Sequence, residues 1–260
     1  MKKSITLILI QLLCLALSVL VSGFVASLLA GQLEQTAITL VSYTTMMSLT
    51  IILLRLFAPR YGWEISSFKP KFGRIDLSLV LLSLLTIEAL GIIVEPVLSL
   101  IPSSYLDGMY MSMEGGMWSI LTFTLAAPIL EEFLFRGIMQ RNLVKFVGSY
   151  WGIVLASFIF GAIHILPQQV IMAFLAGLVL GVVYHLTRSL FTVILIHLLN
   201  NGLAYMLTLF FGREVNYSNL FSLSSTSENY LYYGALAFVV LMGAISVRRI
   251  AAKDKGKRKK

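Results

Sequence analysis

The sequence predicts an all-α protein, a polytopic bundle of about eight transmembrane helices. Of its 260 residues, 58% are hydrophobic and only 12% are charged, and the mean hydropathy is +0.89. Globular domains carry about 25% charged residues. The apolar residues also gather in long, nearly uncharged runs, as in helices that cross a bilayer. These observations exclude a soluble enzyme with a wet surface, a disordered tail and a coiled coil.

Eight apolar runs give the expected helices in order. They cover residues 5–30, 37–57, 77–101, 117–139, 151–166, 170–186, 190–211 and 230–247. The first run is too long for the apolar part of a signal peptide, which has about 7–15 residues, so we expect a retained helix. A spanning helix needs about 20 residues, which makes the fifth and sixth runs marginal. Only residues 166–169 separate these two, which allows a deep turn or a tilted pair.

Basic residues fall in alternate loops and predict the orientation. One set of loops and ends holds Lys2, Lys3, Arg55, Arg60, Lys69, Lys71, Arg74, Arg141, Lys145, Arg188 and the basic tail 248–260. The other set holds Glu34, Asp107, Glu114, Arg213, Glu214 and Glu228. Basic loops stay in the cytoplasm, so we expect a multi-pass protein of the cell membrane with both termini cytoplasmic. The tail follows an apolar run and suits anionic headgroups of the lipid bilayer, so no nucleic-acid partner is expected.

The chain divides at two loops, 58–74 and 102–116. We expect N-terminal transmembrane helices over 1–116, a catalytic core over 117–210, and a last helix with the basic tail over 211–260. The single cysteine, Cys14, excludes an intramolecular disulfide and a zinc site built from cysteines. It lies in the first apolar run and is interpreted as a packing residue.

Ionisable residues inside apolar runs are costly and each suggests a function. They are Glu88, Glu95, Glu131, Glu132, Arg136, His164, His185 and His197. Glu88 and Glu95 rank below the later residues. His185 is expected at the membrane interface, because it lies near the end of its run beside Arg188.

The strongest cluster is Glu131, Glu132 and Arg136. Glu132 and Arg136 are four residues apart, so on a helix they share a face and can form an ion pair. Glu131 is turned by about 100° and can point elsewhere. One carboxylate would then be neutralised, while the other remains available as a general base. Pro128 is expected to kink this helix and expose backbone carbonyls. The alternative is a purely structural buried ion cluster.

Two further pairs have the spacing of one helical turn. Phe160 precedes His164, and His197 precedes Asn201, so each pair projects from one face. Two imidazoles and the carboxylates could hold a divalent metal such as zinc, or could form a base with an oxyanion site. One difficulty is depth. His164 lies about 20 Å beyond Trp151, whereas His197 lies about 10 Å beyond Leu190.

Glu-Glu-x-x-x-Arg at 131–136, Phe-x-x-x-His at 160–164 and His-x-x-x-Asn at 197–201 resemble the three motifs of the CPBP family. These are the CAAX proteases and bacteriocin-processing enzymes, also called Abi proteins, which are intramembrane endopeptidases. The resemblance covers roughly residues 117–210, and it is closest to bacterial members, so a prenylated substrate is not expected. It implies a membrane peptide or protein as substrate.

The resemblance also implies roles. Glu131 would activate water, supported by Glu132 and Arg136. His164 would contact water or a metal, and His197 and Asn201 would serve the oxyanion or the metal. A metal, if bound, would involve Glu131, His164 and His197; a metal-independent glutamate protease is the alternative. Two other functions remain open: a non-enzymatic bacteriocin-immunity or scaffold protein, and a transporter or proton channel. The transporter is the weaker of these alternatives, because the sequence shows no evident inverted repeat of the kind that many transporters have.

Overall fold

The computed structural model describes residues 2–57, 60, 75–106, 116–211 and 224–258. The residues Lys69, Lys71, Arg74, Asp107, Glu114, Arg213 and Glu214, used above to predict orientation, lie outside this described part. Within it, all regular elements are helices, and seven of them are long and apolar enough to cross a membrane. The predicted all-α membrane bundle is therefore confirmed.

The described residues form six long helices besides a central one. They are α1 (Lys2–Leu29), α2 (Gln35–Phe57), α3 (Leu77–Leu98), α9 (Pro167–Thr187), α10 (Leu190–Phe211) and α12 (Ser225–Arg258). The central helix is continuous from Gly116 to Val147 but changes its winding. It consists of α5 (Gly116–Ile120), η3 (Leu121–Ala126), α6 (Ala127–Glu132), η4 (Phe133–Gln140) and α7 (Arg141–Val147). A short 3₁₀ turn, η2 (Ser103–Leu106), follows α3.

The fifth apolar run forms a short helix. α8 (Ser149–Ala162) has 14 residues, fewer than the roughly 20 that a crossing needs. It begins after Gly148, whose φ of 85° favours glycine and separates α8 from α7. It ends before residues 163–166, which turn the chain into α9. The sixth run is not marginal, because α9 has 21 residues. The deep turn and the tilted pair both stay predictions.

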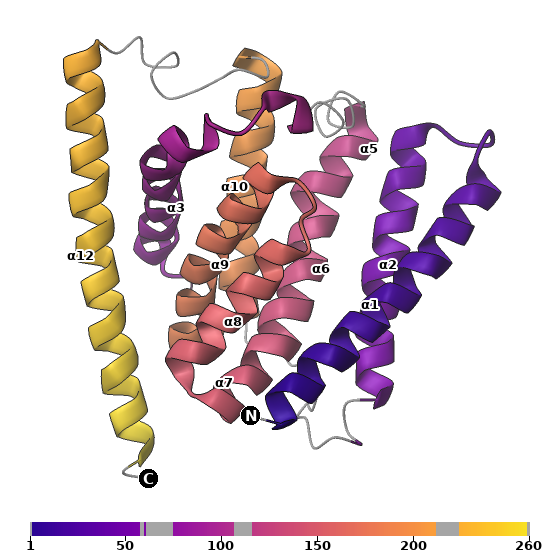
Figure 1. The fold of residues 1–260 in the computed structure, drawn as a ribbon, viewed down its shortest axis with the longest axis horizontal. Helices are drawn as coiled ribbons and strands as arrows, with labels where there is room; N and C mark the ends of the chain where they lie inside the picture. Colours follow the sequence, from indigo (N-terminus) through magenta and orange to yellow (C-terminus); the bar gives the residue numbers. More distant parts are fainter. Residues whose placement is uncertain (1, 58–59, 61–74, 107–115, 212–223, 259–260) are drawn as a thin grey trace.

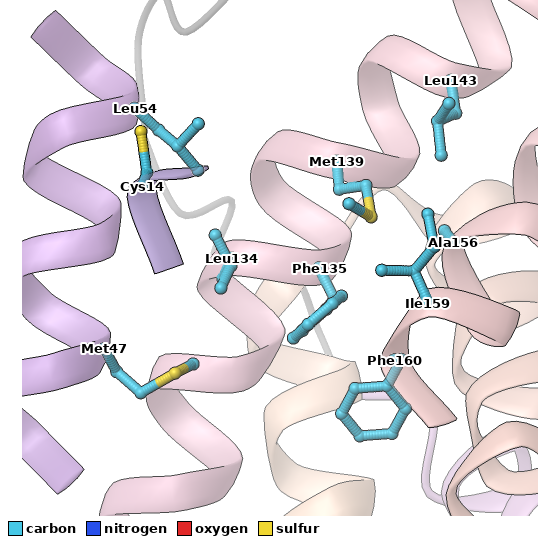
Figure 2. Close-up of a cluster of buried hydrophobic side chains, with 10 residues drawn as sticks. All are labelled: Cys14, Met47, Leu54, Leu134, Phe135, Met139, Leu143, Ala156, Ile159 and Phe160. Carbon is cyan, nitrogen blue, oxygen red and sulfur yellow. The ribbon is translucent and has the colours of Figure 1, made fainter. Parts of the chain in front are cut away.

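The central helix lies between two groups of helices (Figure 1). The hairpin of α1 and α2 packs on one side, and α8 and α9 pack together on the other. Figure 2 shows the buried cluster that joins them: Met47 and Leu54 of α2 lie near Leu134 of the central helix, whose Phe135 contacts Phe160 of α8. Cys14 is buried in this cluster, which confirms its role as a packing residue.

The last helix packs against α3 and is hydrogen-bonded to α8 and α9 near its C-terminal end. The start of α1 and the end of α12 lie at the same end of the bundle (Figure 1). There, Lys253 Nζ donates to the carbonyls of His185 and Leu186 at the end of α9 (2.6 and 2.7 Å). Ser149 Oγ donates to Asp254 Oδ1 at 2.8 Å. His185 lies 3.7 Å from the same oxygen and is fully buried by neighbouring helices. Its position at the membrane interface stays a prediction.

Candidate active site

The change in winding around α6 follows from its sequence. In an α-helix the N–H of Ala127 would bond to the carbonyl of Phe123, but here it bonds to Thr122 O, five residues back. A continued π-helical pattern would pair Phe123 O with residue 128. Pro128 has no N–H, so the carbonyl of Phe123 has no main-chain donor at either position. The expected effect of Pro128 on backbone carbonyls is thus visible, as wider winding. Stretches of π-helix are frequent at functional sites.

Glu132 and Arg136 form the predicted ion pair. Arg136 Nε lies 3.2 Å from Glu132 Oε2, and both side chains are completely buried. The guanidinium also lies over the ring of Phe160, 4.9 Å from its centroid, and its NH2 reaches Gly177 O at 3.4 Å. Stacking on an aromatic face suits a weakly hydrated guanidinium. Arg136 therefore ties the central helix to both α8 and α9.

His197 brings the two adjacent carboxylates together. Its Nδ1 lies 2.9 Å from Glu132 Oε1, and its Nε2 lies 3.8 Å from Glu131 Oε2. An ionised carboxylate only accepts hydrogen bonds, so Nδ1 carries the proton that binds Glu132. The expectation that Glu131 points elsewhere is therefore only half right. Its carboxylate is separate from Arg136 but faces the other nitrogen of the same imidazole.

His164 lies just beyond the end of α8. Its Nδ1 donates to Phe160 O at 2.8 Å, because a carbonyl oxygen can only accept. The ring of Phe160 contacts both imidazoles at its edges, with centroids 5.1 Å from His164 and 5.9 Å from His197. The two histidines thus flank one phenyl ring, so the predicted difference in depth does not separate them.

Asn201 is tied to the unusual winding. Its Nδ2 donates to Phe123 O at 3.0 Å, the carbonyl that Pro128 leaves without a main-chain donor. A side-chain amide has a second N–H. Glu131, Glu132, Arg136 and His197 are therefore in direct contact, while His164 joins them through Phe160 and Asn201 through the backbone of the central helix.

One contact to the site was not predicted. Tyr43 of α2 donates its hydroxyl to Glu131 Oε1 at 2.5 Å. The sequence carries a weak signal for it, since Tyr43 is a phenol in the middle of an apolar run. Nothing in the spacing of 37–57 relates it to Glu131, 88 residues later.

The residues expected to hold a metal do not form a ligand set here. Among the described residues, no group of three or more His, Cys, Asp or Glu side chains is arranged to hold a metal ion. Nδ1 of His164 is bonded to Phe160 O, and Nδ1 of His197 to Glu132. In both rings Nε2 is the nitrogen left for a metal, as in metal-bound histidines whose other nitrogen is held by a carbonyl or a carboxylate. We derive no step through a metal. A divalent metal stays a prediction.

Residues 113–203 match the family model described as type II CAAX prenyl endopeptidase Rce1-like. The match covers roughly a third of the chain and contains all six predicted site residues, from Glu131 to Asn201. No curated protein and no solved structure matches the chain. The segment that builds the central helix, α8, α9 and the first part of α10 is therefore similar to the CAAX protease (CPBP) family.

Proposed function

We propose that the protein is an intramembrane endopeptidase that hydrolyses a peptide bond in a membrane-associated peptide or protein. One observation carries the proposal: two adjacent buried carboxylates meet the two nitrogens of His197, and only one of them forms an ion pair with Arg136. A purely structural ion cluster would need only the pair Glu132 and Arg136. The family match to residues 113–203 supports a protease.

In the proposed mechanism Glu131 is the general base. A water molecule donates one proton to Glu131 while its oxygen attacks the carbonyl carbon of the scissile bond, and the carbonyl becomes a tetrahedral oxyanion. Glu131 then passes the proton to the leaving nitrogen. Glu132 accepts a hydrogen bond from Nδ1 of His197 and so directs Nε2 toward Glu131. Carboxylates orient the functional histidines of other active sites in the same way.

The oxyanion needs a donor in a site of low polarity. The second N–H of the Asn201 amide is the donor we assign, because the first is fixed on Phe123 O and so sets the position of the whole amide. His164 has a different part: its Nδ1 proton is held by Phe160 O, so Nε2 of the neutral ring is an acceptor that can receive a hydrogen bond from the attacking water.

The test compares membranes that contain the wild-type protein with membranes that contain Glu131→Gln, by sequencing new peptide N-termini. We expect wild-type-dependent termini to fall by about 100-fold or more in the variant, the range of general-base contributions. Glu95→Gln, a carboxylate of α3 outside the site, is the matched control and should leave the termini unchanged.

Two outcomes would overturn the proposal. One is full cleavage by folded Glu131→Gln; the other is a cellular effect of the wild type that Glu131→Gln retains, which would indicate the non-enzymatic membrane factor. A parallel sample with a chelator separates the two chemistries. Cleavage that is lost with the chelator and restored by added zinc would show that a metal takes part.

A further inference from the structure

We propose that Tyr43 of α2 is a positioning residue for Glu131, so that the site is completed by a helix outside the family-matched segment 113–203. This inference rests on the proposed role of Glu131 as general base. It concerns the hydroxyl of Tyr43, which donates to Glu131 Oε1 at 2.5 Å.

The ring and the hydroxyl of Tyr43 have different roles on α2: the ring packs, and the hydroxyl forms a hydrogen bond. Met47, Thr50 and Leu54 follow it along the helix at turn-like intervals, and all three are fully buried. This face of α2 packs against the central helix, toward which Met47 points in Figure 2. An apolar side chain such as leucine or phenylalanine would suit the packing on this face of α2. The phenol adds only a hydrogen-bond donor, and that donor meets the proposed base.

The hydrogen bond from Tyr43 gives the two carboxylate oxygens of Glu131 different partners. Oε1 of Glu131 accepts the phenol hydrogen, while Oε2 faces His197 Nε2 at 3.8 Å. An O–H···O⁻ distance of about 2.5–2.7 Å is typical of a charge-assisted hydrogen bond, which is stronger than a neutral one. The bond therefore fixes the plane of the carboxylate, and Oε2 is left as the oxygen that takes the proton from water.

Orientation of this kind matters because the base must meet the water at a defined angle. A displacement of about 1 Å can cost about 100-fold in rate. The ion pair of Arg136 is made with Glu132, so it does not fix the orientation of the Glu131 carboxylate. Tyr43 supplies that restraint from a different helix, and the α1–α2 hairpin must be docked for the base to be oriented.

The kinetic test uses Tyr43→Phe, with Tyr184→Phe as the matched control. Tyr184 is a buried tyrosine of α9 in a separate apolar cluster with Val80 and Leu180. The readout is the initial rate at which the Glu131-dependent N-termini appear in native membranes. We expect Tyr43→Phe to slow it by between about tenfold and 100-fold at unchanged thermal stability, and Tyr184→Phe to leave it within about twofold.

A spectroscopic test does not depend on a substrate. The infrared difference between wild type and Glu131→Gln isolates the carboxylate bands of Glu131. We expect Tyr43→Phe to shift those bands, and a fluorotyrosine at position 43, which keeps the size of the side chain but is more acidic, to shift them in the opposite sense. If Tyr43→Phe does not fold, the fluorotyrosine protein alone decides.

The outcomes distinguish the two proposals. Unshifted Glu131 bands, or a Tyr43→Phe rate equal to wild type, would overturn the positioning role. If Glu131→Gln leaves the N-termini unchanged, the protease proposal fails, while the infrared bands still decide whether Tyr43 holds Glu131.

Discussion

Removing the positive charge of Arg136 is the sharpest test of how the site is held together. Arg136→Met keeps much of the length and apolar volume of the side chain but removes the guanidinium. Glu132 would then keep only its contact with His197. Both partners of the ion pair are completely buried, so no solvent can replace the lost charge.

The expected cost follows from the geometry. At the observed 3.2 Å between Arg136 Nε and Glu132 Oε2, an effective dielectric constant of about 20 gives an attraction of about 5 kcal/mol. Breaking one partner of a buried pair costs about 3–5 kcal/mol in measured cases. We therefore expect Arg136→Met to lower the free energy of unfolding by about 3–5 kcal/mol.

The assay is equilibrium unfolding in mixed micelles, followed by circular dichroism. Arg55→Met is the control, since Arg55 lies exposed at the end of α2, and it should change the free energy by less than about 0.5 kcal/mol. The double variant with Glu132→Gln should lose about 2 kcal/mol less than the sum of the single variants. Additive losses, or an Arg136→Met protein as stable as wild type, would refute the reasoning.

Three further changes test other parts of the structure. Gly181→Ala should destabilise by about 1–3 kcal/mol in the same unfolding assay, because its Cβ would lie 2.9 Å from Ile153 Cγ2, whereas Gly202→Ala meets nothing within 4 Å; equal effects would contradict this. Asn201→Leu should cost about 1–3 kcal/mol by leaving Phe123 O without its donor, and adding Pro128→Ala, which restores an N–H, should recover part of it; no recovery would count against the explanation of the winding. Lys253→Ala should speed amide hydrogen exchange in the last turns of α12, and unchanged exchange would show that the two hydrogen bonds to α9 do not hold this end.

Contacts within a helix were predictable from the sequence because the helical repeat fixes them. The pair Glu132–Arg136 forms as the four-residue spacing requires, and the membrane bundle follows from the long apolar runs.

Gly177 and Gly181 let α8 and α9 approach closely, and their carbonyls accept hydrogen bonds from Arg136 and Gln140. Arg136 and Gln140 are four residues apart, and so are the two glycines. The two hydrogen bonds therefore repeat once per turn along both helices.

Contacts between helices were not predictable in the same way, because they depend on how far each helix is rotated and shifted. The direction of Glu131 was predicted from its turn of about 100° relative to Glu132. His197 nevertheless reaches both carboxylates, since one imidazole presents two nitrogens on opposite sides. Tyr43 lies 88 residues before Glu131, and a single sequence carries no signal that joins them.

The end of α8 determines how His164 is placed beside Phe160. A helix of 14 residues rises about 21 Å, and His164 follows in the turn rather than in the middle of a span. Its ring then rests against Phe160, whose ring also contacts His197, in the third turn of α10. A full-length α8 would carry residue 164 inside a regular helix, with its side chain direction set by that helix. Ending α8 at Ala162 allows Nδ1 of His164 to fold back on Phe160 O. The end of α8 at Ala162 is therefore part of how the site is built.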